Sequence, residues 1–326
     1  MQNNRFDFLN PALFKKILKK IYDDDKVELH EFLTKLTQQN YQGEISQSYN
    51  LCLASDFINL VTSGYTEFVS SRNYSKLPTF LFEFDTLLSL DLSTACSIDF
   101  PKDLKSLPNL TSLNLENCKI DNFDFLKSLH KLTFLNLANT SISSIPEVFC
   151  ELQKLQILNL SNNPNITDDE GLRTYKKIQN CEDLKFISVR NNSLEVLPPA
   201  LLHLKNLVAI DCRENSITQY FDLKKLEKLS GFYHDHMQDS QQLFEFLNLL
   251  KGSNLINSGL FLMHYNQLYK IPVVGDGDSY LRLDVNKFNQ RLKEIESSNF
   301  TIDKPSNSPR DLVTELMKTG GRHLAL

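Results

Sequence analysis

Six cysteines are the side chains best suited to nucleophilic or metal chemistry, and their spacing argues against both. No two form a Cys-x-x-Cys pair, and neighbouring cysteines are at least 22 residues apart. A zinc cluster needs ligands close in sequence on at least one side, and the spacing does not resemble that of a disulfide cap. We therefore expect free thiols in a reducing compartment. The residues are Cys52, Cys96, Cys118, Cys150, Cys181 and Cys212.

Other motifs for catalysis or cofactor binding do not emerge. The segment GDGDS at 275–279 carries two Asp residues, but an EF-hand loop needs a longer ligand set that ends in Glu, so we expect a turn there. The chain has neither a glycine-rich phosphate loop nor a G-x-S-x-G nucleophile elbow. We expect no catalytic residue, no metal and no cofactor, so the predicted function is binding and not catalysis.

The composition is that of an ordinary globular protein. Of 326 residues, 41% are hydrophobic and 23% are charged, which excludes a mainly disordered chain. The formal net charge of -5 argues against nucleic acid as the partner. No run of 18 apolar residues occurs, and charges interrupt the first 25 residues. We therefore expect no integral membrane association, no secretory signal and a cytoplasmic location.

An internal repeat organises most of the chain. Five segments follow the pattern Leu-x-x-Leu-x-Leu-x-x-Asn/Cys-x-Leu, with fainter copies before and after them. The pattern resembles the leucine-rich repeat family over roughly residues 65–273, and the resemblance implies an α/β solenoid with parallel strands on its concave face. The clear copies begin at Leu110, Leu132, Leu155, Leu184 and Leu207, and the fainter ones at Leu87, Leu229 and Ser258, with a half-copy at Tyr65.

Alternation along each short strand assigns the core. The two apolar residues of Leu-x-Leu point inward and the residue between them points outward, so stacked repeats bury one continuous face. We expect the ninth position to end the strand, where its side chain satisfies backbone groups of the turn. That position holds Cys118, Asn163, Asn192, Asn215 and Asn266, with Thr140 as a weaker substitute, so Cys118 is predicted to be structural.

The convex side and the two ends are predicted to be helical. Apolar-Pro pairs such as Ile145-Pro146 and Leu197-Pro198 indicate short extended or 3₁₀ segments, whereas the two 29-residue steps have room for helices at 168–180 and 239–250. Residues 1–64 are predicted to form an N-terminal helical cap. Residues 274–326 are predicted to form a C-terminal cap, with a helix at 284–297, and a tail.

The N-terminal segment allows an alternative function. FLNPALFKKILKKIYDDDKVELHEFLTKL loosely resembles an F-box, and F-box proteins often carry leucine-rich repeats. That resemblance implies a substrate adaptor that recruits a cullin ubiquitin ligase through these helices, although Asn10 interrupts the usual Leu-Pro start between Leu9 and Pro11. The chain also resembles the leucine-rich repeat effectors that bacterial pathogens inject into host cells, which would place it in the host cytosol.

A strip of large side chains on the strands is the candidate partner site. Phe134, Ile157 and Phe186 share the third position of successive repeats, where other copies have Ser or Ala. We expect them to be exposed on the concave face, because they lie outside the set of inward residues. An exposed apolar patch usually marks a partner. The alternative is that flanking loops or a cap cover the strip. The fifth positions are mostly short and polar, and we expect an ordinary solvated face there.

Further candidates lie beside this strip. The full predicted partner-binding set is Phe134, Ile157, Phe186, Arg190, Arg213, Tyr233, His264 and Tyr265. Asp235, His236 and His264 fall on adjacent repeats and would be the place for a divalent metal, if there were one, whereas His234 is predicted to lie in the core. The overall prediction is a monomeric, non-enzymatic scaffold that binds another protein through the concave face.

Overall fold

The chain was analysed as a computed structural model. It describes residues 56, 60, 63, 66–70, 81, 85–93, 104, 107–166, 174–235, 237, 240–250, 253–257, 273–274 and 282–283. The chain divides into two compact units, Met1–Lys131 and Leu132–Leu326, called unit 1 and unit 2 below.

Unit 1 contains three short parallel strands that follow chain order. They are β1 (Glu67–Val69), β2 (Ser89–Asp91) and β3 (Ser112–Asn114). The register aligns equivalent repeat positions, so Ser89 pairs with Ser112 and Leu90 with Leu113. A 3₁₀ helix, η2 (Asp124–Ser128), follows β3.

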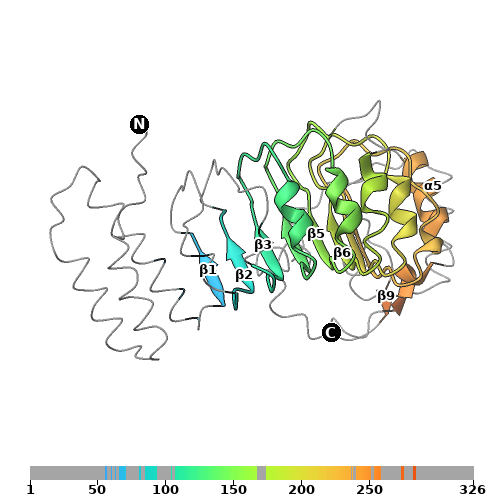
Figure 1. The fold of residues 1–326 in the computed structure, drawn as a ribbon. Coiled ribbons are helices and arrows are strands. Elements are labelled where there is room, and N and C mark those ends of the chain that lie inside the picture. Colours follow the sequence, from blue (N-terminus) through green and yellow to red (C-terminus); the bar gives the residue numbers. More distant parts are fainter. Residues whose placement is uncertain are drawn as a thin grey trace, which may run out of the picture. The chain divides into compact units, whose positions relative to one another are not determined.

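Unit 2 continues the same pattern with five parallel strands in chain order (Figure 1). Each has three residues, and each pairs with the next at equivalent repeat positions. The predicted strand face with parallel strands is therefore confirmed. The strands are β4 (Phe134–Asn136), β5 (Ile157–Asn159), β6 (Phe186–Ser188), β7 (Ala209–Asp211) and β8 (Gly231–Tyr233).

The strands are short because the fifth repeat position turns the chain. Oδ1 of Asn136 accepts a hydrogen bond from the backbone N–H of Ala138 at 3.0 Å, and Oδ1 of Asn159 accepts from Ser161 at 3.0 Å. In unit 1, Asn114 accepts from Glu116 at 3.1 Å. Asn and Asp side chains form such turns with their own backbone two residues on. The fifth position therefore has a structural task that we had not predicted.

Helical segments connect the strands. The predicted 3₁₀ segments after Pro146 and Pro198 are confirmed as η3 (Glu147–Glu151) and η5 (Pro199–His203). The predicted helix at 239–250 is confirmed as α5 (Ser240–Leu250). At 168–180, by contrast, the described part is a 3₁₀ helix, η4 (Tyr175–Ile178), in which Lys176 accepts from the N–H of Gln179, three residues on, at 3.2 Å.

The remaining described elements lie at the C-terminal side of unit 2. The 3₁₀ helix η6 (Leu223–Lys225) is capped by Asp222, which accepts from the N–H of Lys224. Then follow η7 (Asn254–Asn257) and an antiparallel pair, β9 (Val273–Val274) and β10 (Arg282–Leu283).

The inward positions form the core, as predicted. The eight side chains at the fourth and sixth positions of four repeats have no exposed surface: Leu113, Leu115, Leu135, Leu137, Leu158, Leu160, Ile187 and Val189. Helix α5 adds Leu243, Phe246, Leu247 and Leu250, each 1% exposed. Because one repeat cannot bury this face alone, its burial depends on the stacking of neighbouring repeats.

Several predictions fall outside the described residues. Residues 1–55 and 284–326 belong to this group, so both helical caps, the helix at 284–297, the F-box-like segment and the domain boundaries at 64 and 273 stay predictions. The turn at 275–279 also lies outside, between the paired strands β9 and β10. No described helix combines the length and apolarity needed to cross a membrane.

Candidate protein-binding surface

A ladder of ninth-position side chains ties the repeats of unit 2 together. Asn163 has no exposed surface, and its Nδ2 donates to the carbonyls of Leu137 at 2.8 Å and Leu160 at 3.0 Å. Its Oδ1 accepts from the N–H of Thr140 at 3.1 Å. Asn192 in turn accepts from the N–H of Asn163 at 2.9 Å. The predicted role of this position, which is to satisfy backbone groups of the turn, is confirmed.

The hydrogen bonds of the ninth-position side chain differ between unit 1 and the C-terminal side of unit 2. In unit 1, Sγ of Cys118 donates to the carbonyl of Leu92 at 3.1 Å, so this thiol serves the backbone in a structural role. In unit 2, Asn192 donates from its N–H to Asn215 at 2.9 Å, and Asn215 donates from its N–H to the carboxylate of Asp235 at 3.1 Å. The carboxylate of Asp235, just after β8, thus accepts the last hydrogen bond of the asparagine ladder.

An apolar row runs along the outward face of β4 to β8. It comprises Phe134, Ile157, Phe186, Ala209 and Tyr233, which form one cluster. The first four are direct partners in the strand register. As predicted, Phe134, Ile157 and Phe186 lie on neighbouring strands, on the side away from the inward leucines.

The expected exposure of this row is wrong. Phe134 is 3% exposed, Ile157 is 1% exposed and Phe186 has no exposed surface. The fifth positions that we expected to be solvated are buried as well: Asn136, Asn159, Ser188 and Asp211. Strand alternation specifies the side on which a residue lies, but it does not specify whether further chain covers that side. Whether the row binds a partner stays a prediction.

Tyr233 belongs to the same row because Gly231, at the third position of β8, has no side chain. A Cβ atom added at Gly231 would lie 3.0 Å from Cβ of Ala209 and 3.2 Å from Cε2 of Tyr233. The tyrosine ring therefore occupies the space beside Gly231 where a third-position side chain would lie. Tyr233 was predicted to belong to a separate cluster with His264 and Tyr265, which lie outside the described residues.

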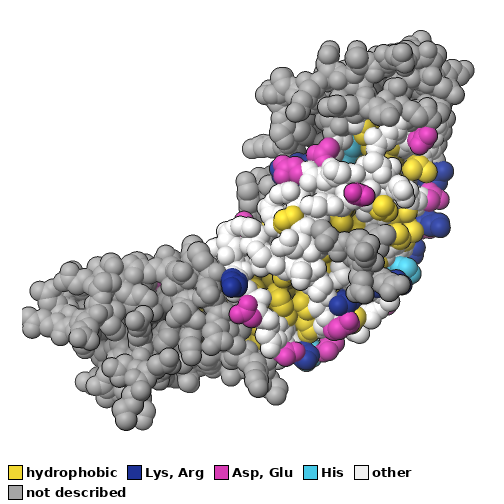
Figure 2. Space-filling view, turned by 90° about the horizontal axis from the view of Figure 1, so that it is seen from above, with side chains coloured by type: hydrophobic (Ala, Val, Ile, Leu, Met, Phe, Trp, Pro, Cys, Tyr) yellow, Lys and Arg dark blue, Asp and Glu magenta, His cyan; other side chains and the backbone are white. Residues whose placement is uncertain are grey.

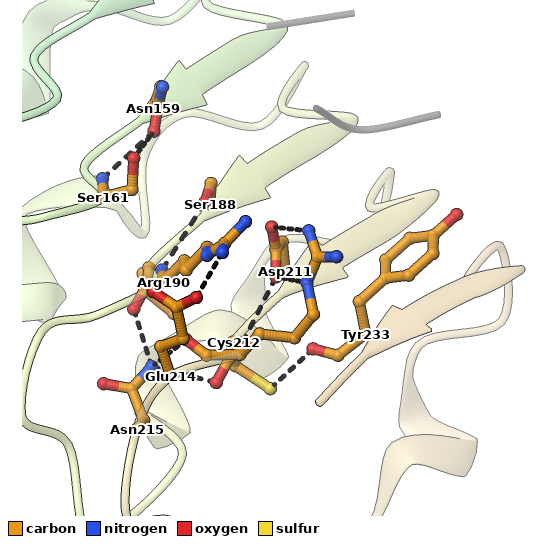
Figure 3. A network of polar contacts seen from close by, with 11 residues as sticks. Asn159, Ser161, Ser188, Arg190, Asp211, Cys212, Glu214, Asn215 and Tyr233 are labelled. Atoms are coloured by element: carbon orange, nitrogen blue, oxygen red, sulfur yellow. Dashed lines mark hydrogen bonds and ion pairs between the residues drawn. The ribbon is translucent and has the colours of Figure 1, made fainter. Parts of the chain in front are cut away.

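Arg213 contacts both Asp211 and Tyr233 at the end of the row, and these two partners are labelled in Figure 3. Its Nε and Nη2 donate to the two carboxylate oxygens of Asp211 at 2.8 and 2.7 Å. Its guanidinium carbon lies 5.6 Å from the centroid of the Tyr233 ring, within the range of a cation–π contact. Asp211 is 2% exposed, so this ion pair is part of the packed surface. Burial also raises the pKa of the Tyr233 hydroxyl.

Arg190 is more accessible and has a different partner. It donates to the carboxylate of Glu214, with 35% of the Arg190 side chain and 49% of the Glu214 side chain exposed. This hydrogen bond raises the pKa of Arg190 and lowers that of Glu214. Arg190 and Arg213 share the seventh position of neighbouring repeats, and we call them the rim arginines.

Glu214 has an unusual backbone conformation for its residue type. Its φ is 58°, and the eighth position is left-handed in the other clear repeats too, where the residue is always Asn: Asn117, Asn139, Asn162 and Asn191. Asn tolerates this region much better than Glu does. Asp211 and Glu214 were both missed as site residues. Two features of the sequence could have identified them. Asp211 is an acidic side chain at the fifth position, and Glu214 replaces the Asn that the other clear repeats have at the eighth position.

His234 and the buried thiols show no sign of catalytic chemistry. His234 is 3% exposed and packs against Tyr220, Phe232 and Phe246, so its predicted place in the core is confirmed. Burial raises the pKa of Cys181 to about 12 and that of Cys212 well above its usual value. A thiol with a raised pKa is a poor nucleophile, because the thiolate is the reactive form.

The described residues contain no group of three His, Cys, Asp or Glu side chains that could hold a metal ion. Asp235 is described and hydrogen-bonded, but His236 and His264 are not described. On the face shown in Figure 2, basic and acidic side chains of the described part are interspersed and not separated by sign.

Comparison with known proteins gives one family match. Residues 130–174 match a family model described as "Leucine Rich repeats (2 copies)". A search of the curated proteins finds no match.

Among the solved structures similar to this chain are three bacterial proteins. Internalin C2 of Listeria monocytogenes is 20% identical with a TM-score of 0.40, and the alignment covers 53% of this chain and 74% of that one. A leucine-rich repeat protein of Leptospira interrogans is 20% identical with a TM-score of 0.39 over 56% and 57%. The functional domain of InlJ from Listeria monocytogenes is 20% identical with a TM-score of 0.37 over 54% and 42%. The chain thus spans less than two thirds of the last two.

The matched segment contains two repeats of unit 2, and the same pattern continues in the strands and ladder around it. Leucine-rich repeat proteins are in general interaction modules without catalytic activity. The repeated sequence, the parallel strands in register and the family match at residues 130–174 together show that this chain contains leucine-rich repeats.

Proposed function

We propose that this protein is a non-enzymatic scaffold that binds a partner protein through the strand face of unit 2. The binding surface consists of the apolar row and the two rim arginines. The observation that carries the proposal is the continuity of the row over five neighbouring strands. In unit 1 the same repeat position has Ser89 and Ser112, so the repeat itself does not require large side chains there.

The energetics favour contact with other chain over contact with water. Phe134, Ile157 and Phe186 are already out of water in the chain alone. A partner would therefore replace the groups that now surround them, and burial against either stabilises each side chain by roughly 1.5–3 kcal/mol. The row spans roughly 19 Å over five strands at a spacing of about 4.8 Å. It therefore suits a protein segment that presents several apolar side chains in line.

The rim arginines add specificity. Tyr and Arg are enriched among the residues that dominate binding energy at protein interfaces. Arg213 is held in place by Asp211 and the Tyr233 ring. Arg190 keeps an exposed side, so a carboxylate of the partner can exchange with Glu214 as its ion-pair partner. We infer an apolar partner segment with an acidic residue at its edge.

Four cysteines support a reducing location. Cys118, Cys150, Cys181 and Cys212 are free, and all of them except Cys150 are buried. We therefore propose that the protein acts in a cytosol, where thiols stay reduced. If it is a bacterial effector, this would be the cytosol of the host cell.

A capture experiment with matched charge reversals tests the function. Full-length protein is immobilised, and proteins retained from cell extract are quantified for the unchanged chain, Arg190→Glu and Lys127→Glu. Lys127 forms an exposed ion pair with Asp124 in unit 1 and serves as the control. We expect at least a tenfold loss of one retained protein with Arg190→Glu and no loss with Lys127→Glu. Equal retention by both variants would contradict the proposed surface.

A further inference from the structure

The two rim arginines are paired with carboxylates of different accessibility (Figure 3). Arg213 bonds Asp211 within its own repeat, and only 11% of the Arg213 side chain and 2% of the Asp211 side chain are exposed. Arg190 bonds Glu214 of the following repeat, and these side chains are 35% and 49% exposed. Because an exposed ion pair contributes little to stability, Glu214 is the carboxylate that an incoming acidic group can displace.

The turn itself does not require a glutamate at position 214. The backbone there is left-handed, and the other clear repeats have Asn, which adopts this conformation with less strain. Where two of these asparagines are neighbours, Nδ2 of Asn191 donates to Oδ1 of Asn162 at 2.9 Å. An ionised carboxylate cannot donate such a hydrogen bond. Glu214 instead accepts from Arg190, so its side chain serves the arginine and not the turn.

Glu214 also makes the surroundings of Arg190 negative. The hydrogen bond from Arg190 to Glu214 is the main cause of the raised pKa of Arg190, and the charges of Asp211 and Asp235 add to it. Together with Arg213, these side chains carry two positive and three negative charges, which sum to -1. A further carboxylate is therefore repelled while Glu214 is in place. Without the charge of Glu214, the same sum is zero.

We propose that Glu214 is an internal competitor that determines which acidic partners can bind Arg190. The inference deepens the proposed function and rests on it. Because Glu214 belongs to the same chain, its carboxylate is present beside Arg190 at a high effective concentration. An acidic chain alone does not displace it. A partner that also contacts the apolar row does, because those contacts supply the additional affinity. Glu214 thereby excludes acidic chains that lack an apolar segment.

Modification of arginine side chains tests this competition without a partner. Phenylglyoxal, which attacks the unprotonated guanidinium, is applied to the full chain, and the modified fractions of Arg190 and Arg213 are followed by peptide mass spectrometry. Glu214→Gln removes the charge and keeps the side-chain length. Glu214→Asn supplies the residue of the other repeats and keeps the test valid if the first variant folds poorly. Glu195→Gln, the same charge change at another exposed site of unit 2, is the control.

The acidic probe is poly-L-glutamate, which has no apolar side chains. We expect Arg190 to react roughly threefold faster in both Glu214 variants than in the unchanged chain, because the carboxylate that favours its protonated form is gone. The rate at Arg213 and the rates in Glu195→Gln should stay nearly unchanged. Poly-L-glutamate should then protect Arg190 in the Glu214 variants at about one tenth of the concentration that the unchanged chain requires.

Three results would overturn the inference. An unchanged reaction rate at Arg190 would mean that Glu214 does not occupy this arginine. Equal protection by poly-L-glutamate with and without Glu214 would mean that Glu214 does not compete. Stronger protection of the unchanged chain would mean that Glu214 orients Arg190 for its ligand. Since no partner is present, failure here is distinguishable from failure of the capture experiment, which tests whether Arg190 takes part in binding at all.

Discussion

Units 1 and 2 use the same framework but differ on their outward faces. In both, leucines at the fourth and sixth positions are buried, and a fifth-position side chain accepts a hydrogen bond from the turn. The third position has Ser in β2 and β3 and remains partly exposed, whereas Phe134, Ile157 and Phe186 in unit 2 are buried. The difference shows that the inward residues build the repeat and the outward ones determine what the surface contacts.

The largest loss in the free energy of unfolding is expected at the third repeat position, where the two units differ most in burial. Phe186→Ala removes a side chain with no exposed surface, so we expect the free energy of unfolding to fall by about 3–5 kcal/mol. Ser112→Ala, at the same repeat position in unit 1, should change it by less than about 0.5 kcal/mol. Urea denaturation of both variants measures the contrast. A small loss for Phe186→Ala would show that the row is not packed against other chain.

The ninth-position hydrogen bonds should contribute more to the free energy of unfolding in unit 2 than in unit 1. Asn163→Ala removes three hydrogen bonds to carbonyls and two from Thr140, one from its N–H and one from its hydroxyl, all of them buried. Since each unsatisfied buried group costs about 1–3 kcal/mol, we expect a loss of about 3 kcal/mol. Cys118→Ala removes weaker thiol hydrogen bonds, to the carbonyl of Leu92 at 3.1 Å and to that of Glu116 at 3.8 Å, and should cost about 1 kcal/mol. Denaturant midpoints compare the two, with the exposed Asn165→Ala as control. Equal losses at Asn163 and Cys118 would contradict the ladder.

Thiol burial in unit 2 predicts sensitivity to high pH. The pKa of Cys181 is raised from 9.0 to about 12 by burial and, secondarily, by Cys150. Above pH 9 the thiol ionises in the unfolded chain and stays protonated in the folded one, so stability falls as pH rises from 9 towards 12. Cys181 contributes a slope of about 1.4 kcal/mol per pH unit. Cys181→Ala should remove this contribution and leave that of Cys212, whose pKa is raised as well.

Melting curves at several alkaline pH values measure this slope, with Cys150→Ala as the half-buried control. If Cys181→Ala and the unchanged chain lose stability with the same slope, the thiol is not protected by the fold.

The smallest effect concerns the eighth position. Glu214→Asn relieves left-handed strain but loses an exposed ion pair, which is worth about 0–1 kcal/mol. We expect a net gain of about 0.5 kcal/mol in unfolding free energy. The reverse change in unit 1, Asn117→Glu, introduces the same left-handed strain and should cost about 1 kcal/mol. Thermal melting distinguishes the two directions, and a loss for Glu214→Asn would mean that the ion pair outweighs the strain.

The framework was predictable from the sequence because its requirements recur in every repeat. Inward leucines and ninth-position asparagines each perform the same task several times, so their roles follow from the pattern. The turn made by the fifth position was also present in the sequence as recurring Asn, Asp and Ser, but it was interpreted as a solvated face. The 3₁₀ helix at Tyr175–Ile178 was not distinguished from an α-helix because short apolar spacing fits both.

The surface was only partly predictable. Strand alternation identified Phe134, Ile157 and Phe186 as one strip, yet it did not predict that all three side chains are buried. The pair of Arg213 with Asp211 depends on side-chain directions at a turn. The place of Tyr233 beside Gly231 depends on a missing Cβ atom in the same strand. Repeat periodicity carries none of this information.

The central claim is that the strand face of unit 2 is covered while that of unit 1 is open, and tryptophan fluorescence tests it most directly. The chain contains no tryptophan, so Phe186→Trp and Ser112→Trp each introduce a single probe at the same repeat position. We predict blue-shifted emission and protection from acrylamide quenching for Phe186→Trp, and red-shifted, readily quenched emission for Ser112→Trp. Equal quenching of the two probes in folded protein would contradict the account.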